Sequence, residues 1–231
     1  MKFRYATPLL IDCVHSLMNE FKDDKSNTLC ILGAECFADQ YNYDEFTHGY
    51  DKVIIYNFEP LSCTYDADLS YIESESTWIT SKPCYEWLRL ADEVWDYDVH
   101  NIQVLESIGI QASLHILNPW KNWDLYAPVN KDIDVLFIGG TYNKRRKRLL
   151  DYLSQKYNIK IIDMDNPIYG DALDDYILRS KLLLNVHGVS NLQEQTRMIR
   201  WIGAPCQIIS EKSAHNYLGV PEKEYWELFL L

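Results

Sequence analysis

A strand-to-helix turn in the middle of the chain, FIGGTYNKRRKRLL, has the residue types needed to hold a phosphate group. Gly139, Gly140 and Thr141 follow a short apolar run. In parallel α/β sheets ligands bind at the carboxyl ends of strands, where glycines let a phosphate approach the backbone and a helix N-terminus faces it. Arg145 belongs to the run of cations at 144–148, of which helical spacing directs only one or two towards one ligand. The alternative is an ordinary turn before a solvated basic helix face.

A second group of polar residues follows the apolar run KLLL. Asn185, His187 and Gly188 come at the end of that predicted strand, so we expect them at the mouth of a binding cleft. Glu194 and Arg197 are three residues apart on the next predicted helix and therefore share one face. A carboxylate there can accept hydrogen bonds from both ribose hydroxyls, while Arg197 and the helix N-terminus favour phosphate. The group predicts a nucleotide site; the competing interpretation is a glutamate that complements the helix dipole and pairs with Arg197.

The elements that must position these residues alternate between strand and helix. Apolar runs typical of buried parallel strands lie at 28–33, 52–58, 93–97, 113–118, 134–140, 159–163, 181–187 and 206–210. Helical patterns cover 8–22, 100–109, 143–157, 171–179 and 192–201. Two successive runs of this kind predict an α/β protein of two Rossmann-like, doubly wound domains that face a cleft. The segment 118–132 has no apolar period and is the expected linker, so we place the domains at 1–127 and 128–231.

The composition restricts the classes of partner and compartment. The chain has 22 Lys and Arg against 34 Asp and Glu, a net charge of -12, which disfavours sequence-independent binding to a polyanion. Its six cysteines form no C-x-x-C pair and are typical of free thiols in a reduced compartment. Asp12, His15 and Asn19 interrupt the N-terminal apolar stretch, which is therefore neither a secretory signal nor a membrane span. We expect a cytoplasmic, soluble protein with no membrane partner.

Several segments together resemble the two domains of GT-B glycosyltransferases, especially short bacterial and bacteriophage ones. The donor-binding domain is resembled by DVLFIGGTYNKRRKRLLDYL, YGDALDDYILRSKLLLNVH and EQTRMIRWIGAPCQIISE, and the acceptor-side domain by IIYNFEPL and ADEVWDYDVHNIQVLESIGI. The resemblance spans most of the chain and implies that Glu194 binds the donor ribose. The activity that it implies is transfer of a sugar from a nucleotide diphosphate sugar, with a UDP-sugar favoured, to an acceptor hydroxyl.

Two glutamates are candidate catalytic residues. An inverting transferase needs a general base for the acceptor hydroxyl, and such a base normally lies on the acceptor domain. Glu35 and Glu59 each come just after a predicted strand of the first domain, in a loop at its carboxyl end. Asp12 and His15 share a predicted helix with apolar neighbours, which favours a structural role. A retaining enzyme needs no protein base, because the donor phosphate can assist, and the sequence leaves that alternative open.

No metal or other cofactor is expected besides the nucleotide-sugar co-substrate. Asp163 and Asp165 form a D-x-D pair, which in the other large class of glycosyltransferases holds Mg²⁺ or Mn²⁺ on the donor diphosphate. D-x-D is frequent by chance in an acidic chain, and the doubly wound pattern favours the metal-independent class.

The acceptor stays open between a glycan or small molecule and the hydroxymethylated bases of bacteriophage DNA. The DNA alternative requires extrusion of the target base and a positive groove, for which the first domain offers Arg4, Lys82, Arg89 and Lys121. An alternative of a different class is a non-catalytic nucleotide-binding or scaffold protein with a GT-B-like shell. A methyltransferase or dehydrogenase fits less well, because the glycine turn lies mid-chain without the usual glycine spacing or an acidic residue in the right context at the end of the following strand.

Overall fold

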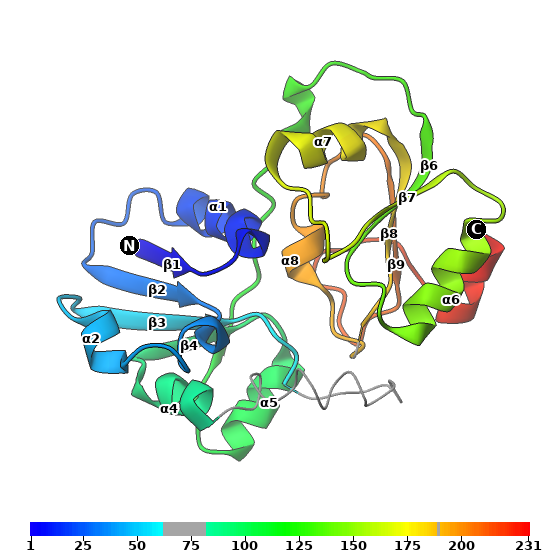
Figure 1. The fold of residues 1–231 in the computed structure, drawn as a ribbon. Helices are drawn as coiled ribbons and strands as arrows, with labels where there is room; N and C mark the ends of the chain where they lie inside the picture. Colours follow the sequence, from blue (N-terminus) through cyan, green and yellow to red (C-terminus); the bar gives the residue numbers. More distant parts are fainter. Residues whose placement is uncertain (62–81, 189) are drawn as a thin grey trace. The chain divides into compact units, whose positions relative to one another are not determined.

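The chain folds into two compact units, each built on its own sheet (Figure 1). The computed structural model describes residues 1–61, 82–188 and 190–231. The first unit ends at Asn118 and the second begins at Pro119. Each unit contains a five-stranded parallel sheet, so the predicted α/β class with two Rossmann-like sheets is confirmed.

The sheet of the first unit has its strands in sequential order. They are β1 (Lys2–Tyr5), β2 (Thr28–Leu32), β3 (Lys52–Asn57), β4 (Glu93–Asp96) and β5 (Ser113–Leu114). This order has no reversal, unlike the order expected for a doubly wound sheet. The sequence did not predict β1, because the four residues KFRY lie at the sheet edge and lack an apolar run.

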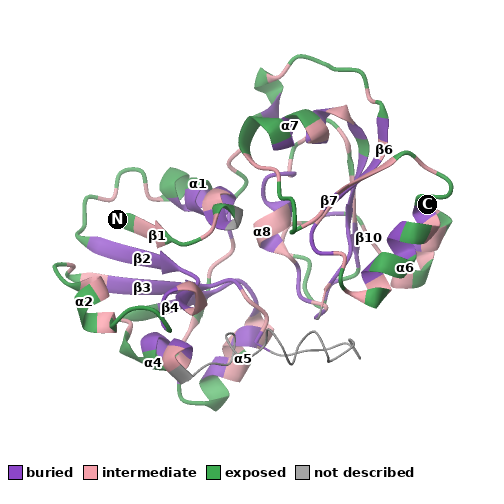
Figure 2. Cartoon of the chain, viewed as in Figure 1, coloured by how far each residue is buried: buried purple, intermediate pink, exposed green. Residues whose placement is uncertain are grey.

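Helices cover both faces of this sheet (Figure 2). The helical segments are η1 (Pro8–Leu10), α1 (Ile11–Glu20), η2 (Ala34–Cys36), α2 (Tyr43–Thr47), α4 (Lys82–Leu90) and α5 (Val99–Ser107). Ile31, Ile55 and Val94 pack in one core with Trp87 of α4 and Leu105 of α5. On the opposite face Phe21, which ends α1, stacks on Trp95 at 5.6 Å between ring centroids. Burial on both faces explains the continuous apolar runs of β2 and β3.

The sheet of the second unit has the order β10-β9-β8-β6-β7, which reverses at β6. Its strands are β6 (Ile133–Ile138), β7 (Ile159–Ile162), β8 (Ser180–Asn185), β9 (Gln207–Glu211) and β10 (Glu222–Lys223). The chain passes from β6 to β7 on one side and returns to β8 on the other side. The doubly wound order is therefore confirmed for this unit.

Two separate cores lie on the two faces of the second sheet. Its helical segments are η3 (Trp123–Leu125), α6 (Lys144–Leu153), α7 (Gly170–Arg179), α8 (Gln195–Met198) and η4 (Tyr225–Leu230). Phe137 packs with Leu150 of α6 and Leu228 of η4. Leu136 packs on the other face with Ile177 of α7 and Met198 of α8. Alternate residues of β6 thus point into different cores.

The segment predicted as a linker packs onto the second unit from Pro119 onwards. Trp123 lies in the core of that unit, and its Nε1 donates a hydrogen bond to the carbonyl oxygen of Arg200 at 3.0 Å. Lys121 forms an ion pair of 2.5 Å with the buried Asp174. The sequence did not indicate this packing, because the segment forms only one short 3-10 turn and has no helical period.

The described residues bear on two expectations from the sequence, the lack of a membrane span and the chemical state of the cysteines. Within the described ranges, no helix combines the length and the apolar character required to cross a bilayer. Among the described cysteines, at 13, 30, 36, 84 and 206, no disulfide bond forms.

Candidate functional site

The carboxyl ends of β6 and β8 lie next to each other at the point where the strand order reverses. The two strands pair in parallel, with Phe137 opposite Leu184. Gly139, Gly140 and Thr141 follow β6, while His187 and Gly188 follow β8. In open α/β sheets this is the position where ligands bind. The fold therefore brings together the two groups of residues that the sequence singled out, and we call this region the switch edge.

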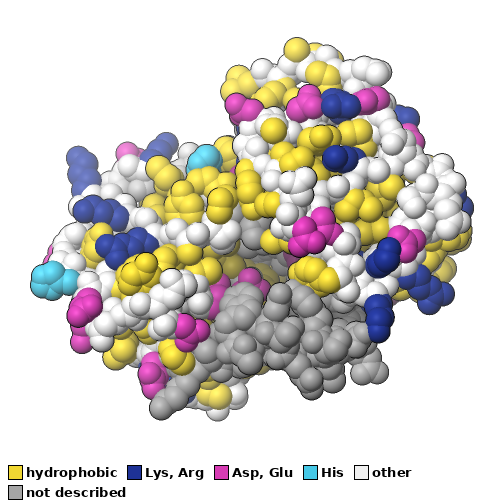
Figure 3. Space-filling view, in the orientation of Figure 1, with side chains coloured by type: hydrophobic (Ala, Val, Ile, Leu, Met, Phe, Trp, Pro, Cys, Tyr) yellow, Lys and Arg dark blue, Asp and Glu magenta, His cyan; other side chains and the backbone are white. Residues whose placement is uncertain are grey.

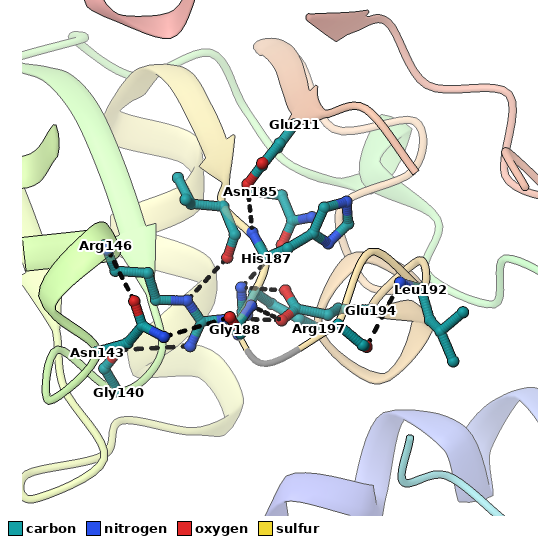
Figure 4. Close-up of polar contacts among 12 residues, drawn as sticks. Gly140, Asn143, Arg146, Asn185, His187, Gly188, Leu192, Glu194, Arg197 and Glu211 are labelled. Carbon is teal, nitrogen blue, oxygen red and sulfur yellow. Dashed lines mark hydrogen bonds and ion pairs between the residues drawn. The ribbon is translucent and has the colours of Figure 1, made fainter. Parts of the chain in front are cut away.

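Glu194 bridges two arginines at the switch edge (Figure 4). Its Oε1 lies 2.5 Å from Nη2 of Arg146, and its Oε2 lies 2.5 Å from Nη1 of Arg197. The amide of Gly188 also donates to Oε1 at 3.2 Å. A carboxylate has about four acceptor positions. Three are thus engaged, and the fourth, on Oε2, has no donor among the described residues and could accept from a ligand hydroxyl.

Arg146 connects the ends of β6 and β8 to this carboxylate. Its Nε donates to the carbonyl oxygen of Val186 at 2.9 Å, and its Nη1 to that of Gly140 at 3.4 Å. Arg146 is only 4% exposed. Asn143, the residue that precedes α6, caps the helix by accepting from the amides of Arg145 and Arg146 at 2.9 and 3.1 Å. The cap fixes the start of α6 and so directs Arg146 inwards.

Arg145 binds Glu211 at the end of β9. Two of its guanidinium nitrogens donate to the two oxygens of that carboxylate, and the guanidinium lies 3.8 Å from the ring centroid of Tyr225. Glu211 also accepts from the amide of His187 at 3.0 Å. Arg145 is therefore held at the end of β9 by a bidentate ion pair, with Glu211 as its counter-charge.

The glycines of the switch edge make room for arginine side chains. Gly139 has a φ of 142°, and a Cβ there would come within 2.7 Å of Nη2 of Arg197. A Cβ on Gly188 would lie 3.2 Å from Nη2 of Arg146. The sequence predicted that Gly139 and Gly140 let a phosphate approach the backbone. In this structure the guanidinium of Arg197 approaches Gly139, and the ring of Tyr142 approaches Gly140.

Thr141 faces β7. Its amide donates to Oδ2 of Asp163 at 3.1 Å, and its hydroxyl donates to the same oxygen. Burial alone would raise the pKa of Asp163, but the hydrogen bonds from Thr141 and from nearby amides outweigh it and lower that pKa. Asp163 is thus ionised and engaged by protein donors. Across the described residues, no three His, Cys, Asp or Glu side chains are grouped so as to hold a metal ion.

His187 is buried and neutral at physiological pH. Burial lowers the pKa of its imidazole to about 4; the charge of Glu194 opposes this shift, and the charges of the nearby arginines add to it. Its Nε2 lies 3.3 Å from Oγ of Ser213. Its Nδ1 makes no hydrogen bond with the part of the chain that the structure describes. Asn185, also buried, accepts from Nη1 of Arg197 at 2.8 Å.

Around Glu194 and Glu211 the switch edge carries an excess of positive charge, whereas the ionised Asp163 is held separately by Thr141. Arg145, Arg146 and Arg197 face the two carboxylates of Glu194 and Glu211. Burial raises the pKa of Glu194, but the charges of Arg197 and Arg146 outweigh it, so the pKa is lowered. Burial lowers the pKa of Arg197 to about 10, which still leaves it charged at neutral pH. One positive charge thus remains for an anion.

Arg197 is the donor best suited to that anion. Its Nη1 is shared by Glu194 and Asn185, whereas its Nη2 and Nε donate to no other residue in the described ranges. Its side chain is 15% exposed. A guanidinium with two adjacent donors left over matches the geometry of phosphate oxygens.

The first unit brings its two candidate carboxylates close to one thiol. Glu35 lies in η2 after β2, and Glu59 follows β3. Burial, and then the charges of Glu35 and Glu59, raise the pKa of Cys36 to about 12, so both carboxylates lie within electrostatic range of it. Burial also raises the pKa of Glu35 to about 7. A carboxyl group that titrates near neutrality can exchange protons at physiological pH.

A buried carboxyl that the sequence did not single out lies at the same edge of the first sheet. Burial raises the pKa of Asp96, at the end of β4, to about 7, although three hydrogen bonds partly oppose the shift. Its donors are the side chains of Asn57 at 2.8 Å and Asn101 at 3.1 Å and the amide of Asp98 at 2.9 Å. Asn101 also donates to the carbonyl oxygen of Glu59 at 3.0 Å. This network positions the loop that carries Glu59.

Sequence reasoning missed Arg146 and Glu211 as well, and a signal was present for each. The apolar face of α6 contains Leu149, Leu150 and Leu153, and the same face continued by one turn reaches Arg146. The helical phase of these leucines therefore identifies Arg146 as the inward-facing residue among the five cations at 144–148. Glu211 directly follows the apolar run of β9, next to the end of β8.

Two of the cations suggested for a DNA-binding groove bind backbone carbonyl oxygens of the first unit. Arg4 donates to the carbonyl oxygen of Phe46 at 2.6 Å, and Arg89 to that of Ile108 at 3.3 Å. Lys121 belongs to the second unit and pairs with Asp174. The Lys82 side chain lies outside the described residues.

Comparison with known proteins identifies one viral relative of part of the chain. No protein-family model matches the sequence. The chain is 33% identical over 97 residues to a protein of Acanthamoeba polyphaga mimivirus named "Uncharacterized protein L138". The match covers 41% of this chain and 11% of that protein, so the chain corresponds to about a tenth of its relative's length. The similarity indicates a viral counterpart and carries no activity with it.

Proposed function

We propose that the protein is a glycosyltransferase that binds a nucleoside diphosphate sugar, a UDP-sugar by preference, at the switch edge. The observation that carries the proposal is the charge excess of three arginines over two glutamates at the point of strand reversal. Anionic ligands collect there because arginine donors and strand-end amides face the same place. Transfer to an acceptor hydroxyl, and the GT-B arrangement of the two units, follow from the resemblance in both halves of the sequence.

The proposed chemistry assigns separate tasks to the two units. Arg197 would bind the diphosphate and stabilise the negative charge that develops as it leaves. The one acceptor position left on Glu194 would take a ribose hydroxyl. Glu35, with a pKa of about 7, is the better of the two candidate bases, since a base that titrates near the working pH is both unprotonated and basic enough. The acceptor is a glycan or small molecule, or a modified DNA base.

Calorimetry on the full chain with UDP, UDP-glucose and inorganic pyrophosphate tests donor binding. We expect all three to bind, and we expect Arg197→Gln to weaken each by roughly 10- to 100-fold, since hydrogen bonds to charged groups contribute about 1.5–3 kcal/mol. The control is Lys147→Gln, which removes one charge from the same region but alters a solvent-exposed pair with Asp151. Absence of nucleotide binding, or an equal loss in the control, contradicts the proposal.

The role of Glu194 is tested by comparing two ligands on one variant. Glu194→Ala removes a negative charge, so inorganic pyrophosphate should bind more tightly than to the wild type. If Glu194 also holds the ribose, the preference for UDP over pyrophosphate should fall by about tenfold. Equal tightening for both ligands would make Glu194 a counter-charge only. Glu194→Gln serves as a second variant that keeps the side-chain volume.

Turnover separates an enzyme from a nucleotide-binding protein of the same shape. Release of UDP from a UDP-sugar, in the presence of glycan or hydroxymethylated DNA, is the activity expected. Tight UDP binding without UDP release from any donor and acceptor would favour the non-catalytic alternative.

A further inference from the structure

A second candidate binding site lies in the first unit, and Phe37, the residue that ends the η2 turn of Glu35, forms part of its lining. It is a surface pocket of about 570 Å³ between β1 and α2. Figure 3 shows hydrophobic side chains next to charged ones over this part of the molecule. Aromatic and hydrogen-bonding side chains line it together, and that combination limits what it can bind.

Three aromatic rings form one wall of the pocket. The ring centroids of Phe37 and Phe46 are 4.9 Å apart, those of Tyr41 and Phe46 are 5.3 Å apart, and those of Phe37 and Tyr41 are 6.3 Å apart. Tyr41 is 53% exposed, so part of this aromatic area is open to a ligand. Exposed aromatic rings offer a large apolar area at low conformational cost, which suits the C–H face of a sugar ring.

Polar groups with unused hydrogen-bonding capacity surround the aromatic wall. Arg4 uses one donor on the carbonyl oxygen of Phe46, with its guanidinium 4.3 Å from that residue's ring centroid. Asn42 is held because its side-chain oxygen accepts from the amide of Glu45 at 3.2 Å, which leaves its NH₂ group available. The side chains of Gln40 and Glu45 make no hydrogen bond with the described chain. Donors and acceptors of this kind match the hydroxyl groups of a sugar.

The charge of the pocket selects against charged ligands. One cation, Arg4, is balanced by one anion, Glu45. A phosphate or a nucleic-acid backbone would meet the Glu45 carboxylate without an excess of positive charge, unlike at the switch edge. We propose that the pocket between β1 and α2 binds a neutral saccharide. Its use for the acceptor rests on the proposed function and favours a glycan over DNA, whereas saccharide binding itself does not depend on transfer.

A glycan array probed with the labelled full chain tests the proposal. We expect neutral oligosaccharides to be retained in preference to sialylated, sulfated or phosphorylated ones. Calorimetry with the best-retained neutral oligosaccharide should show binding weakened by about tenfold in Tyr41→Ala, the loss expected for one aromatic contact. Trp226→Ala is the control, because Trp226 is a 64% exposed aromatic residue of the second unit. A Glu45→Lys variant should lose neutral saccharides in the same assay.

The outcomes are separable from those of the donor site. Retention of no neutral glycan, a preference for anionic glycans, or equal binding by wild type and Tyr41→Ala would overturn the proposal. UDP affinity is measured on the same variants and should be unchanged in Tyr41→Ala. Saccharide binding without UDP binding would overturn only the proposed donor function.

Discussion

Replacement of Asp174 by Asn should destabilise the second unit strongly. Asp174 is 1% exposed and lies on α7. Its carboxylate pairs with Lys121 at 2.5 Å and with Arg200 at 2.8 Å, and it accepts from the hydroxyl of Tyr126 at 3.0 Å. Arg200 is itself 4% exposed. The substitution leaves two cations near one another without their counter-charge, which costs about 3–5 kcal/mol for a buried pair.

Urea titration of the full chain measures this loss. Hydrogen exchange of amides in β6 and β8, measured at each urea concentration, reports on the second unit alone. With a urea dependence of about 2 kcal/mol per M, the midpoint should fall by roughly 2 M. Asp175→Asn is the matched control, because Asp175 is the next residue, is 58% exposed and pairs only at the surface with Arg179. It should change the midpoint little.

The loss of stability in Asp174→Asn should depend on pH. Burial raises the pKa of Asp174, but hydrogen bonds from Arg200 and Lys121 outweigh it, so the folded pKa is below the ordinary value of 3.8. The carboxylate therefore stabilises the folded state fully above pH 3.8, and this contribution is lost as the pH falls through the folded pKa. The difference between wild type and Asp174→Asn should shrink in acid. A loss below about 1 kcal/mol at pH 7, or one equal to that of the control, would refute the ion-pair reasoning.

Three further predictions concern the two sheet edges. The wild-type rate constant of sugar transfer should rise with pH near 7, because Glu35 has a pKa of about 7 and ionises there. Glu35→Gln should make the second-order rate constant small and insensitive to pH in that range. A pH–rate profile unchanged by the substitution excludes Glu35 as the base. Asn143→Ala removes the cap of α6 and should lower the free energy of unfolding by about 1 kcal/mol in urea titration, whereas Asn143→Asp should retain most of it. Gly139→Ala should weaken UDP binding in calorimetry, because the added Cβ would push against Nη2 of Arg197. A variant that binds UDP like the wild type would show that Arg197 moves freely.

The buried strands were predictable because parallel strands covered on both faces must be apolar throughout. Residues 28–32 and 52–57, which form β2 and β3, lie within the ranges expected from sequence. By contrast, β1 is an edge strand with a mixed exposure pattern, so no apolar run marked it. The helix expected over 192–201 shrinks to Gln195–Met198, because the preceding loop is held by side-chain hydrogen bonds of Gln193 to Asn216 and Leu218. Such tertiary contacts leave no periodic trace in a sequence.

The candidate site was predictable in its location but not in its internal pairing. The sequence placed strand ends at 140 and 187, two residues beyond the observed ends of β6 and β8, and parallel topology then brings these ends together. The partner of each charge depends on rotamers and helix phase. Arg145 and Arg146 are neighbours in sequence, yet one binds Glu211 and the other Glu194. Asp96 was missed because burial in the folded chain raises its pKa, and its sequence neighbours do not reveal that burial.

The short strand β1 has a consequence for how copies of this chain behave in concentrated solution. Of the described strands, it pairs with β2 alone, so its other side presents unpaired amides and carbonyls that could template a further strand. Lys2 and Arg4 occupy two of its four positions, and both are anchored over aromatic rings, Lys2 on Tyr50 and Arg4 on Phe46. Edge-to-edge association of two copies would crowd these four cations into one short ladder. Arg4, which also lines the pocket, and Lys2 thereby oppose aggregation through the open edge of the sheet.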